Sequence, residues 1–468
     1  MKNKILSPRL MNLISNKVMS KMPFSIRVNS EMETLNNFLD NYFKLQNSNK
    51  VKKLSEYSKK YPLYPKVQLV KARENFNASN WEFVENLRAY AHLRENWINE
   101  NHLDVFNCEF LWPGLYFGAF GNHNQIFSLI RARKSNLRKR NIVGFYKPSQ
   151  QFTNRALMNY LAGYGNIKLI PIDNYPSGSF YRDLMIPSTF VIPFDGVANY
   201  QTFAVSELNK IEFNLGKFCE LQLTEEHEEY GRNFLSSFGI NKNDWFVTLH
   251  MREPSYRGEN RKNTTENFRN VEMESYTSSI NEVIKRGGYV VRVGDSKMTP
   301  LPPKKGVIDY AISKNKSSVL DLFFGAKCAF AITTSSGYRA VPSIFGRPQL
   351  QTNFLPGTHV YEGGTQDVFI LRKLVQKQAH ETIPILRQIN DPFLDIGKDL
   401  EYSNRNLSWI SNTPEELLEG TRFMISKYVD ISSEYKKIEI IDKEQINNEI
   451  NINHPYKPHL YSNILLTH

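Results

Sequence analysis

Hydrophobic and polar positions change their spacing along this chain of 468 residues. From residue 30 to residue 101 the apolar positions follow helical spacing, and Ser30 with Glu33 fits a capping box. From about residue 106 to about residue 350, short apolar runs alternate with helical stretches. Such alternation is typical of open parallel sheets. The pattern therefore predicts a helical region followed by α/β units.

The predicted elements and regions can be given by residue range. Expected strands cover 115–120, 141–146, 166–170 and 189–193 in the first part, and 245–249, 289–293 and 328–332 in the second. Expected helices cover 66–77, 80–99, 151–161, 200–216, 224–238 and 413–429, and another begins near Gln125. Four regions follow: a helical region 1–105, a Rossmann-like domain 106–240, a second Rossmann-like domain 241–410, and a C-terminal helix with a peripheral tail 411–468.

Composition limits the class of protein. Hydrophobic residues make up 41% and aromatic residues 13% of the chain, which is enough for packed cores and excludes wholesale disorder. The net charge of +12 favours an anionic partner, such as nucleic acid, acidic lipid headgroups or a phosphorylated substrate. No apolar run approaches the roughly 20 residues that cross a bilayer, and the cysteines lack metal-ligand spacing. We therefore expect a cytoplasmic protein.

Two segments are strongly basic. Residues 1–27 carry Lys2, Lys4, Arg9, Lys17, Lys21 and Arg27, with Leu10, Leu13, Ile14, Val18 and Met22 at helical spacing. A helix of this kind can lie in the surface of an anionic membrane, or it can dock its apolar face on the body of the protein. The second run, 131–140, is interpreted as a solvated face that could also meet a membrane or the phosphate of a lipid-linked acceptor.

The triplet His250-Met251-Arg252 follows a buried-strand pattern, where ligand groups belong in an α/β domain. An arginine at this place can bind a diphosphate through two parallel hydrogen bonds and neutralise charge as a sugar–phosphate bond breaks. Arg257, beside Gly258, could supply a second cation from a loop. The alternative is a surface arginine with a core histidine behind it.

A hydroxyl-rich turn, Thr333–Gly337, follows the strand 328–332 and precedes a helical stretch. Its hydroxyl groups and free backbone N–H groups at a helix start suit a phosphate. Ordinary N-capping would account for one hydroxyl but not for the others. The expected donor-binding residues here are Thr334, Ser335, Ser336 and Gly337. Pro342 predicts that the helix is short or kinked.

Gly294 and Asp295 end the strand 289–293. They could contact the base or ribose of a nucleotide, or Asp295 could simply cap the loop. Asp321 falls within a helical stretch and is surrounded by apolar residues, which favours a structural hydrogen bond over catalysis.

An earlier strand-to-helix turn contains Gly118, Gly121, Asn122 and His123. Its spacing, GxxGNH, matches neither the dinucleotide motif GxGxxG nor the P-loop. A glycine turn lets a ligand approach the backbone closely, and His123 could act as general base on an acceptor hydroxyl. A lone histidine at a helix start is, however, more often structural.

The segments LHMREPSYRG, GGYVVRVGDSKM and IDYAISKNKSSVLDLFFGAKCAFAITTSSGYRAVPSIFGRP resemble a bacterial family of glycosyltransferases encoded with surface-polysaccharide genes. More distantly, the H-x-R triplet and the Ser-Ser-Gly turn are similar to those of the metal-independent GT-B fucosyltransferase superfamily. The close resemblance covers about residues 110–355, and 245–350 is its most specific part. It implies a GT-B-like α/β fold of two facing Rossmann-like domains.

The resemblance also implies residue roles. The arginine of H-x-R binds the donor diphosphate in that superfamily, which implies this role for Arg252. The Ser-Ser-Gly turn faces the donor phosphates, which implies Ser335, Ser336 and Gly337. One departure is Glu253, because a second arginine often stands at that position. Arg257 could replace that arginine. The departure at Glu253 argues against GDP-fucose specifically and leaves a nucleotide-sugar as the expected donor.

We therefore expect a glycosyltransferase that moves a sugar from a nucleotide-sugar donor to a surface glycan, lipid-linked or protein-linked acceptor. Arg252 would stabilise the leaving diphosphate, and His123 or Glu253 would be the acceptor base. No DxD-type pair stands at a strand end, so no metal or other cofactor is expected. The rival is a non-catalytic scaffold that holds nucleic acid or an anionic membrane surface. Against nucleic acid, no RNA- or DNA-reading motif is present.

Overall fold

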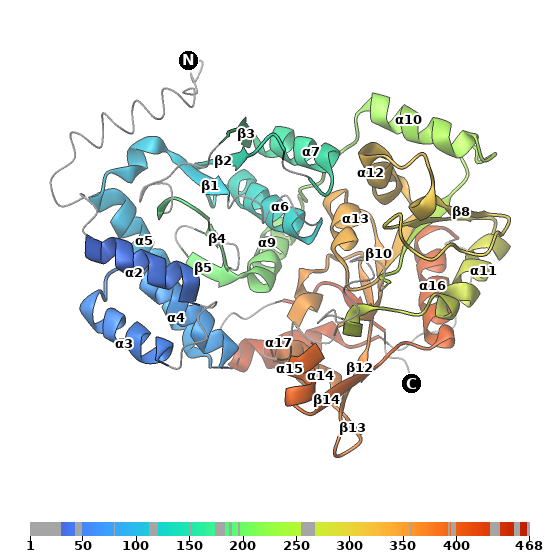
Figure 1. Ribbon diagram of the computed structural model, residues 1–468. Helices are drawn as coiled ribbons and strands as arrows, with labels where there is room; N and C mark the ends of the chain where they lie inside the picture. The colour runs from blue at the N-terminus through green and yellow to red at the C-terminus, as the bar shows by residue number, and fades with distance from the viewer. Residues whose placement is uncertain are drawn as a thin grey trace. The chain divides into compact units, whose positions relative to one another are not determined.

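The computed structural model describes residues 30–42, 49–78, 80–111, 120–149, 152–173, 183–186, 190–194, 197–253, 267–355, 358–391, 394, 399–430, 440–453 and 459–465. The chain divides into two compact units (Figure 1). The first consists of 1–114, 135–150 and 166–199, and the second of 115–134, 151–165 and 200–468. The predicted basic helix of 1–27 lies outside the described residues.

The first unit begins with helices, as predicted. They are α2 (Ser30–Asn41), α3 (Lys50–Lys60), α4 (Pro65–Asn77) and α5 (Glu82–Glu100), followed by the short 3-10 helix η3 (Leu103–Phe106). Pro65 stands in the first turn of α4, where a missing N–H costs no hydrogen bond. Side chains such as Leu35, Val67 and Tyr64 form one apolar cluster. The predicted helical N-terminal region is confirmed.

A three-stranded parallel sheet follows in the first unit, with the order β1-β2-β3. Its strands are β1 (Cys108–Leu111), β2 (Asn141–Tyr146) and β3 (Lys168–Pro171), and a separate two-stranded sheet contains β4 (Phe190–Phe194) and β5 (Val197–Tyr200). The strand expected at 115–120 is wrong at its end, because Phe120 begins helix α6. Residues 115–119 lie outside the described residues. The apolar runs 108–111 and 115–120 stand close together, and periodicity alone cannot decide which of them forms a strand.

The basic run 131–140 is not a solvated face as a whole. Arg131 is buried and binds the Glu212 carboxylate at 2.8 Å within the second unit. Arg138 is buried and binds Glu109 within the first unit. Acids far away in the sequence neutralise these arginines, which a local charge pattern cannot reveal.

The second unit contains a seven-stranded parallel sheet with the order β15-β11-β10-β9-β6-β7-β8. The strands are β6 (Phe246–His250), β7 (Tyr289–Val293), β8 (Val307–Asp309), β9 (Phe330–Thr333), β10 (Gln349–Phe354), β11 (Val368–Leu371) and β15 (Asn463–Ile464). Val247, Val290 and Phe330 are almost fully buried in its core. The predicted strands near 245–249, 289–293 and 328–332 and the α/β class are confirmed.

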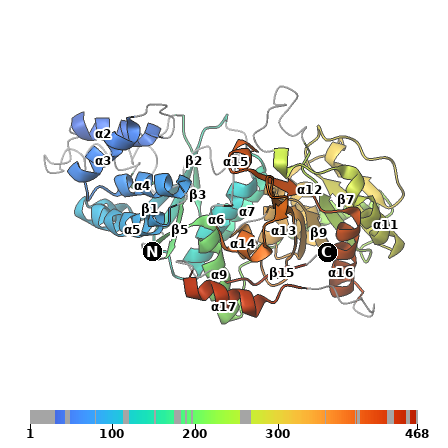
Figure 2. The same ribbon diagram turned by 90° about the horizontal axis from the view of Figure 1, so that it is seen from below.

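The second unit also contains helices (Figures 1 and 2). They are α6 (Phe120–Lys134), α7 (Arg155–Gly165), α9 (Gln201–Leu215), α10 (Glu225–Ser236), α11 (Thr277–Lys285), α12 (Ser318–Lys327), α13 (Ala340–Ile344), α14 (Ile385–Asn390), α15 (Asp399–Asn404), α16 (Pro414–Tyr428) and α17 (Lys443–Asn453). Helices α11 and α16 lie side by side, and α16 contacts β9, β10 and β11. A small antiparallel sheet joins β13 (Glu381–Thr382), β12 (Lys373–Gln376) and β14 (Leu407–Ile410).

Helix α16 begins as its sequence predicts. The Thr413 side chain accepts a hydrogen bond from the Glu416 nitrogen at 3.2 Å, and Glu416 accepts one from the Thr413 nitrogen at 2.9 Å. This capping box, with Pro414 in the first turn, satisfies N–H groups that the helix itself leaves open.

The C-terminal segment is not a peripheral tail. Strand β15 pairs with β11 at one edge of the main sheet. Leu460, Ile464 and Leu465 are nearly completely buried. Because the residues around β15 are mostly polar, the sequence pattern did not indicate this short strand. The prediction of a peripheral tail was therefore wrong.

The expected domain 106–240 is shared between the two units, because β1–β3 belong to the first and α6 and α7 to the second.

Within the described part of the chain, no helix combines the length and apolarity required to span a membrane.

Candidate functional site

The strand order of the second unit places two predicted motifs next to each other. From β6 the chain passes outward through β7 to β8, and it then returns to the other side of β6 to form β9, β10 and β11. This reversal makes the carboxyl ends of β6 and β9 a topological switch point, where open α/β sheets bind ligands. His250 ends β6 and is the register partner of Thr333, which ends β9.

Hydrogen bonds connect the two loops that leave these strands. The Arg252 nitrogen donates to the Thr334 hydroxyl at 3.2 Å. The Ser336 hydroxyl and His250 Nδ1 lie 3.1 Å apart. The H-x-R triplet and the Ser-Ser-Gly turn, 86 residues apart at this contact, therefore form one structural site.

The hydroxyl groups of the turn are held by the protein. The Thr333 hydroxyl donates to Gln349 Oε1 at 3.3 Å, and the Ser335 hydroxyl accepts from the Leu355 nitrogen at 2.9 Å. These contacts fix the turn, so a phosphate would meet backbone groups whose positions are already set. The helix after the turn is short, as predicted: a 3-10 turn, η9 (Gly337–Arg339), leads into α13, which contains Pro342 and ends at Ile344.

Asn270 and Arg269, which the sequence did not reveal, form hydrogen bonds with residues of this site. Arg252, which is 9% exposed, donates from its guanidinium to Asn270 Oδ1 at 2.9 Å. Arg269 donates from Nε to the Ser335 carbonyl at 2.8 Å. No periodic pattern marks this segment, and its only signal is a polar pair between Phe268 and Val271. Arg257 lies outside the described residues.

His250 is a partly buried, neutral group close to several cations. Its ring stacks on Tyr338 with centroids 5.3 Å apart and an interplanar angle of 8°. Desolvation of the ring, together with the positive charges of Arg292, Lys316 and Arg252, lowers the pKa of His250 to about 3. Arg292 and Lys316 are themselves paired with carboxylates. The Arg252 guanidinium instead binds the neutral Asn270 amide, so Arg252 supplies positive potential at the carboxyl ends of β6 and β9.

Glu253 has a structural partner. Its carboxylate binds the guanidinium of Arg292, which is fully buried, and accepts a hydrogen bond from the Thr299 nitrogen at 3.0 Å. Arg292 also binds Asp309 at 3.1 Å. A carboxylate held in this way stabilises the loops after β6 and β7, which argues against Glu253 as the acceptor base.

Gly294 and Asp295 shape the loop after β7. Gly294 has a φ of +153°, and a Cβ there would lie 2.2 Å from the Met298 sulfur. Its carbonyl accepts a hydrogen bond from Lys316 Nζ at 2.6 Å. Asp295 accepts from the Lys297 nitrogen at 2.9 Å, as in the capping alternative. Asp321 binds Lys316 at 3.5 Å, which agrees with the structural role predicted for it.

His123 lies in the first turns of α6, in the same unit as the switch point. It is fully buried, and neither ring nitrogen has a hydrogen-bond partner among the described residues. Burial lowers its pKa to about 4. The start of α6 approaches the Ser-Ser-Gly turn closely, because a Cβ at Gly337 would lie 3.0 Å from the Gly121 nitrogen.

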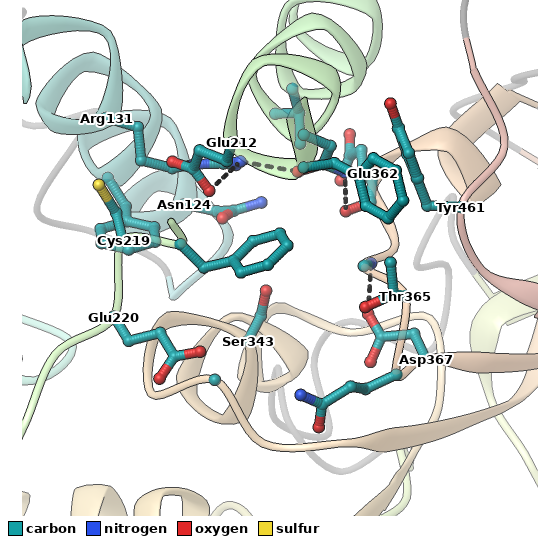
Figure 3. A pocket seen from close by; sticks show the side chains of 18 of the residues that line it. Asn124, Arg131, Glu212, Cys219, Glu220, Ser343, Glu362, Thr365, Asp367 and Tyr461 are labelled. Atoms are coloured by element: carbon teal, nitrogen blue, oxygen red, sulfur yellow. Dashed lines mark hydrogen bonds and ion pairs between the residues drawn. The ribbon is translucent and has the colours of Figure 1, made fainter. Parts of the chain in front are cut away.

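A pocket elsewhere in the second unit is distinct from this site (Figure 3). It is lined by α6, α9 and segments that precede β10 and β11, including Arg347 and Asp367. These segments lie at the amino ends of the strands, whereas ligand groups of a parallel sheet gather at the carboxyl ends. Arg131 and Glu212 form their ion pair in its wall.

No protein-family model matches the sequence, and no curated protein matches it. Among solved structures, the chain is similar to a glycosyl transferase family 9 protein from Veillonella parvula, with a TM-score of 0.38 and 11% identity over 68% of this chain and 97% of that one. It is also similar to ADP-heptose lps heptosyltransferase II from E. coli, with a TM-score of 0.38 and 11% identity over 68% of this chain and 99% of that one. Likeness of this degree carries no argument about function.

The buried His123 predicts a fold that is sensitive to acid. The unfolded chain takes up protons as the pH falls below about 6.5, whereas folded His123 does so only near pH 4. Stability is therefore lost as the pH falls from about 6.5 to about 4, by roughly 3 kcal/mol for this group. Urea unfolding across this pH range should show a weaker pH dependence for His123→Leu than for wild type. His92→Leu, at an exposed position, controls for loss of a surface histidine, and identical slopes for wild type and His123→Leu would contradict the prediction.

Proposed function

We propose that the protein is a GT-B-like glycosyltransferase that uses a nucleotide-sugar donor. One observation carries the proposal: at the switch point, the Arg252 loop and the Ser335–Gly337 turn are hydrogen bonded together beside a neutral His250. A site with this positive potential suits a ligand with concentrated negative charge. The diphosphate that joins a nucleoside to a sugar supplies that charge. The two loops would place this diphosphate next to the carboxyl ends of the strands.

The proposed reaction breaks the bond between sugar C1 and the diphosphate oxygen and forms a bond from C1 to an acceptor hydroxyl oxygen. The Arg252 guanidinium stabilises the negative charge that develops on the leaving diphosphate. The hydroxyl proton passes to a base. We assign this role to His123, whose ring nitrogens have no partner among the described residues; its lowered pKa keeps the imidazole unprotonated at physiological pH and also makes it a weak base. The acceptor we propose is a surface glycan, free or linked to lipid or protein, and the reaction needs no cofactor beyond the donor.

A thermal-shift comparison tests the proposal. GDP, UDP and ADP are each added to the protein, with guanosine, uridine and adenosine as matched controls that lack the diphosphate. At about 100 times its dissociation constant, a ligand of the native state adds about 2.7 kcal/mol to stability. At least one diphosphate should raise the melting temperature far more than its nucleoside does. If none does so while single-stranded RNA stabilises the protein, the nucleic-acid scaffold is the better interpretation.

A further inference from the structure

We propose that Arg372, which is not itself at the switch point, is a positioning residue for the diphosphate site. It would act through the segment Asn267–Val271, which it holds by two backbone carbonyls. The inference rests on the proposed function, since it assigns Arg372 a part in binding the donor diphosphate.

The segment Asn267–Val271 is the element that orients the two arginines of the site. It begins with the 3-10 turn η6 (Asn267–Arg269). Asn270 accepts the hydrogen bond from the Arg252 guanidinium, and the Val271 nitrogen donates to the Arg252 carbonyl at 3.1 Å. Arg269 donates to the Ser335 carbonyl at 2.8 Å. A shift of this segment would therefore move Arg252 and loosen the Ser-Ser-Gly turn together.

Arg372 fixes the position of that segment. It directly follows β11, and its side chain is 1% exposed. One terminal nitrogen donates to the Phe268 carbonyl, and the other donates to the Asn270 carbonyl at 2.6 Å. The planar guanidinium can hold two carbonyls at once in a fixed geometry, which no other side chain reproduces.

The charge of Arg372 is also unusual. Burial lowers its pKa to about 10, and among the described residues it forms no ion pair with a carboxylate. Its partners are neutral carbonyls, and its Nε has no partner in the described part of the chain. A buried cation without an anion is costly, and a bound diphosphate would offset part of that cost. The positive charge of Arg372 therefore also favours binding of the diphosphate.

The segment has a second anchor that does not depend on Arg372. Phe268 is buried and packs edge to face against Tyr402 and Trp409, at centroid distances of 5.0 and 5.5 Å. Loss of the guanidinium should therefore misplace the Asn270 end of the segment while its apolar end stays in the core. We expect a folded protein with a disordered diphosphate site.

The test compares Arg372→Met and Arg372→Lys with wild type. Dissociation constants are measured by calorimetry for the nucleoside diphosphate that stabilises wild type and for its nucleoside. Arg372→Met should weaken diphosphate binding by roughly tenfold or more, as expected for one misplaced hydrogen bond to a charged group, and leave nucleoside binding nearly unchanged. Arg372→Lys, which keeps the charge and can reach one carbonyl, should recover part of the loss and provides a folded variant if the methionine variant is too unstable.

Arg347→Met is the matched control. Arg347 is partly buried and, like Arg372, donates to a backbone carbonyl, that of Ala326 at 2.6 Å, but it lies near the amino end of β10. Both methionine variants should lose stability, and only Arg372→Met should change the ratio of diphosphate to nucleoside affinity. An unchanged ratio in Arg372→Met and Arg372→Lys would overturn the inference and leave the proposed function standing. If wild type binds no nucleoside diphosphate more tightly than the matching nucleoside, the proposed function is contradicted, and the inference that rests on it is contradicted as well.

Discussion

Arg252→Ala is expected to lower the turnover of sugar transfer by about 100- to 1,000-fold, because it removes a charged donor from the developing negative charge of the leaving diphosphate. The substitution should leave the fold intact. The Arg252 backbone, whose nitrogen binds Thr334 and whose carbonyl binds Val271, stays in place without the side chain. Turnover is measured with the nucleotide-sugar whose diphosphate stabilises the protein.

The matched control for this experiment is Arg422→Ala. Arg422 lies on α16, is partly exposed, and pairs with Glu419 within its own helix. Its loss should change turnover little. Arg252→Lys should restore part of the activity, since an ammonium keeps the charge but not the two parallel donors. Full turnover by Arg252→Ala, in a protein with unchanged circular dichroism, would exclude the assigned role.

Arg292→Met is expected to produce the largest loss of stability, about 3–5 kcal/mol in the free energy of unfolding. The Arg292 side chain is fully buried, and it binds Glu253 and Asp309, whose side chains are 8% and 15% exposed. Removing the cation leaves two carboxylates in a poorly solvated place. Urea denaturation at neutral pH measures the change.

Two further variants decide whether the ion pairs cause this loss. The triple variant Arg292→Met, Glu253→Gln, Asp309→Asn should regain part of the stability, because neutral amides tolerate burial better than unpaired carboxylates. Arg88→Met, which breaks an exposed pair with Glu85, should change the free energy of unfolding by less than about 1 kcal/mol. A loss for Arg292→Met as small as that of Arg88→Met would contradict the prediction.

Periodicity predicted the parts of the fold that depend on local spacing. Strand β7 was expected at 289–293 and lies there, because a short run rich in valine between glycines is typical of a buried strand. A helix was also expected over 413–429, and α16 lies there; Thr413, Pro414 and Glu416 act on neighbouring backbone groups at its start. Strand β15 was missed because two residues in a polar segment give no periodic signal.

The residues of the candidate site also divide into those that the sequence pattern indicates and those that it does not. The sequence indicated His250, Arg252 and the turn Thr333–Gly337 because each follows an apolar strand, and parallel strands bring their carboxyl ends to one edge. The sequence could not indicate Asn270 or Arg372, because their roles depend on contacts between distant segments. Glu253 was interpreted as a possible base because the sequence does not reveal that Arg292 faces it from the next strand.

The strand order also has a consequence for the time course of folding. Strands β6 and β9 are neighbours in the sheet, yet β7, β8 and α12 lie between them in the chain. Their pairing closes a long loop, which is entropically unfavourable until the intervening elements are in place. The proposed diphosphate site would therefore form only after this closure. A bound nucleotide would stabilise the finished sheet more than the transition state that precedes it, and so would prolong the lifetime of the folded protein without shortening the time needed to fold.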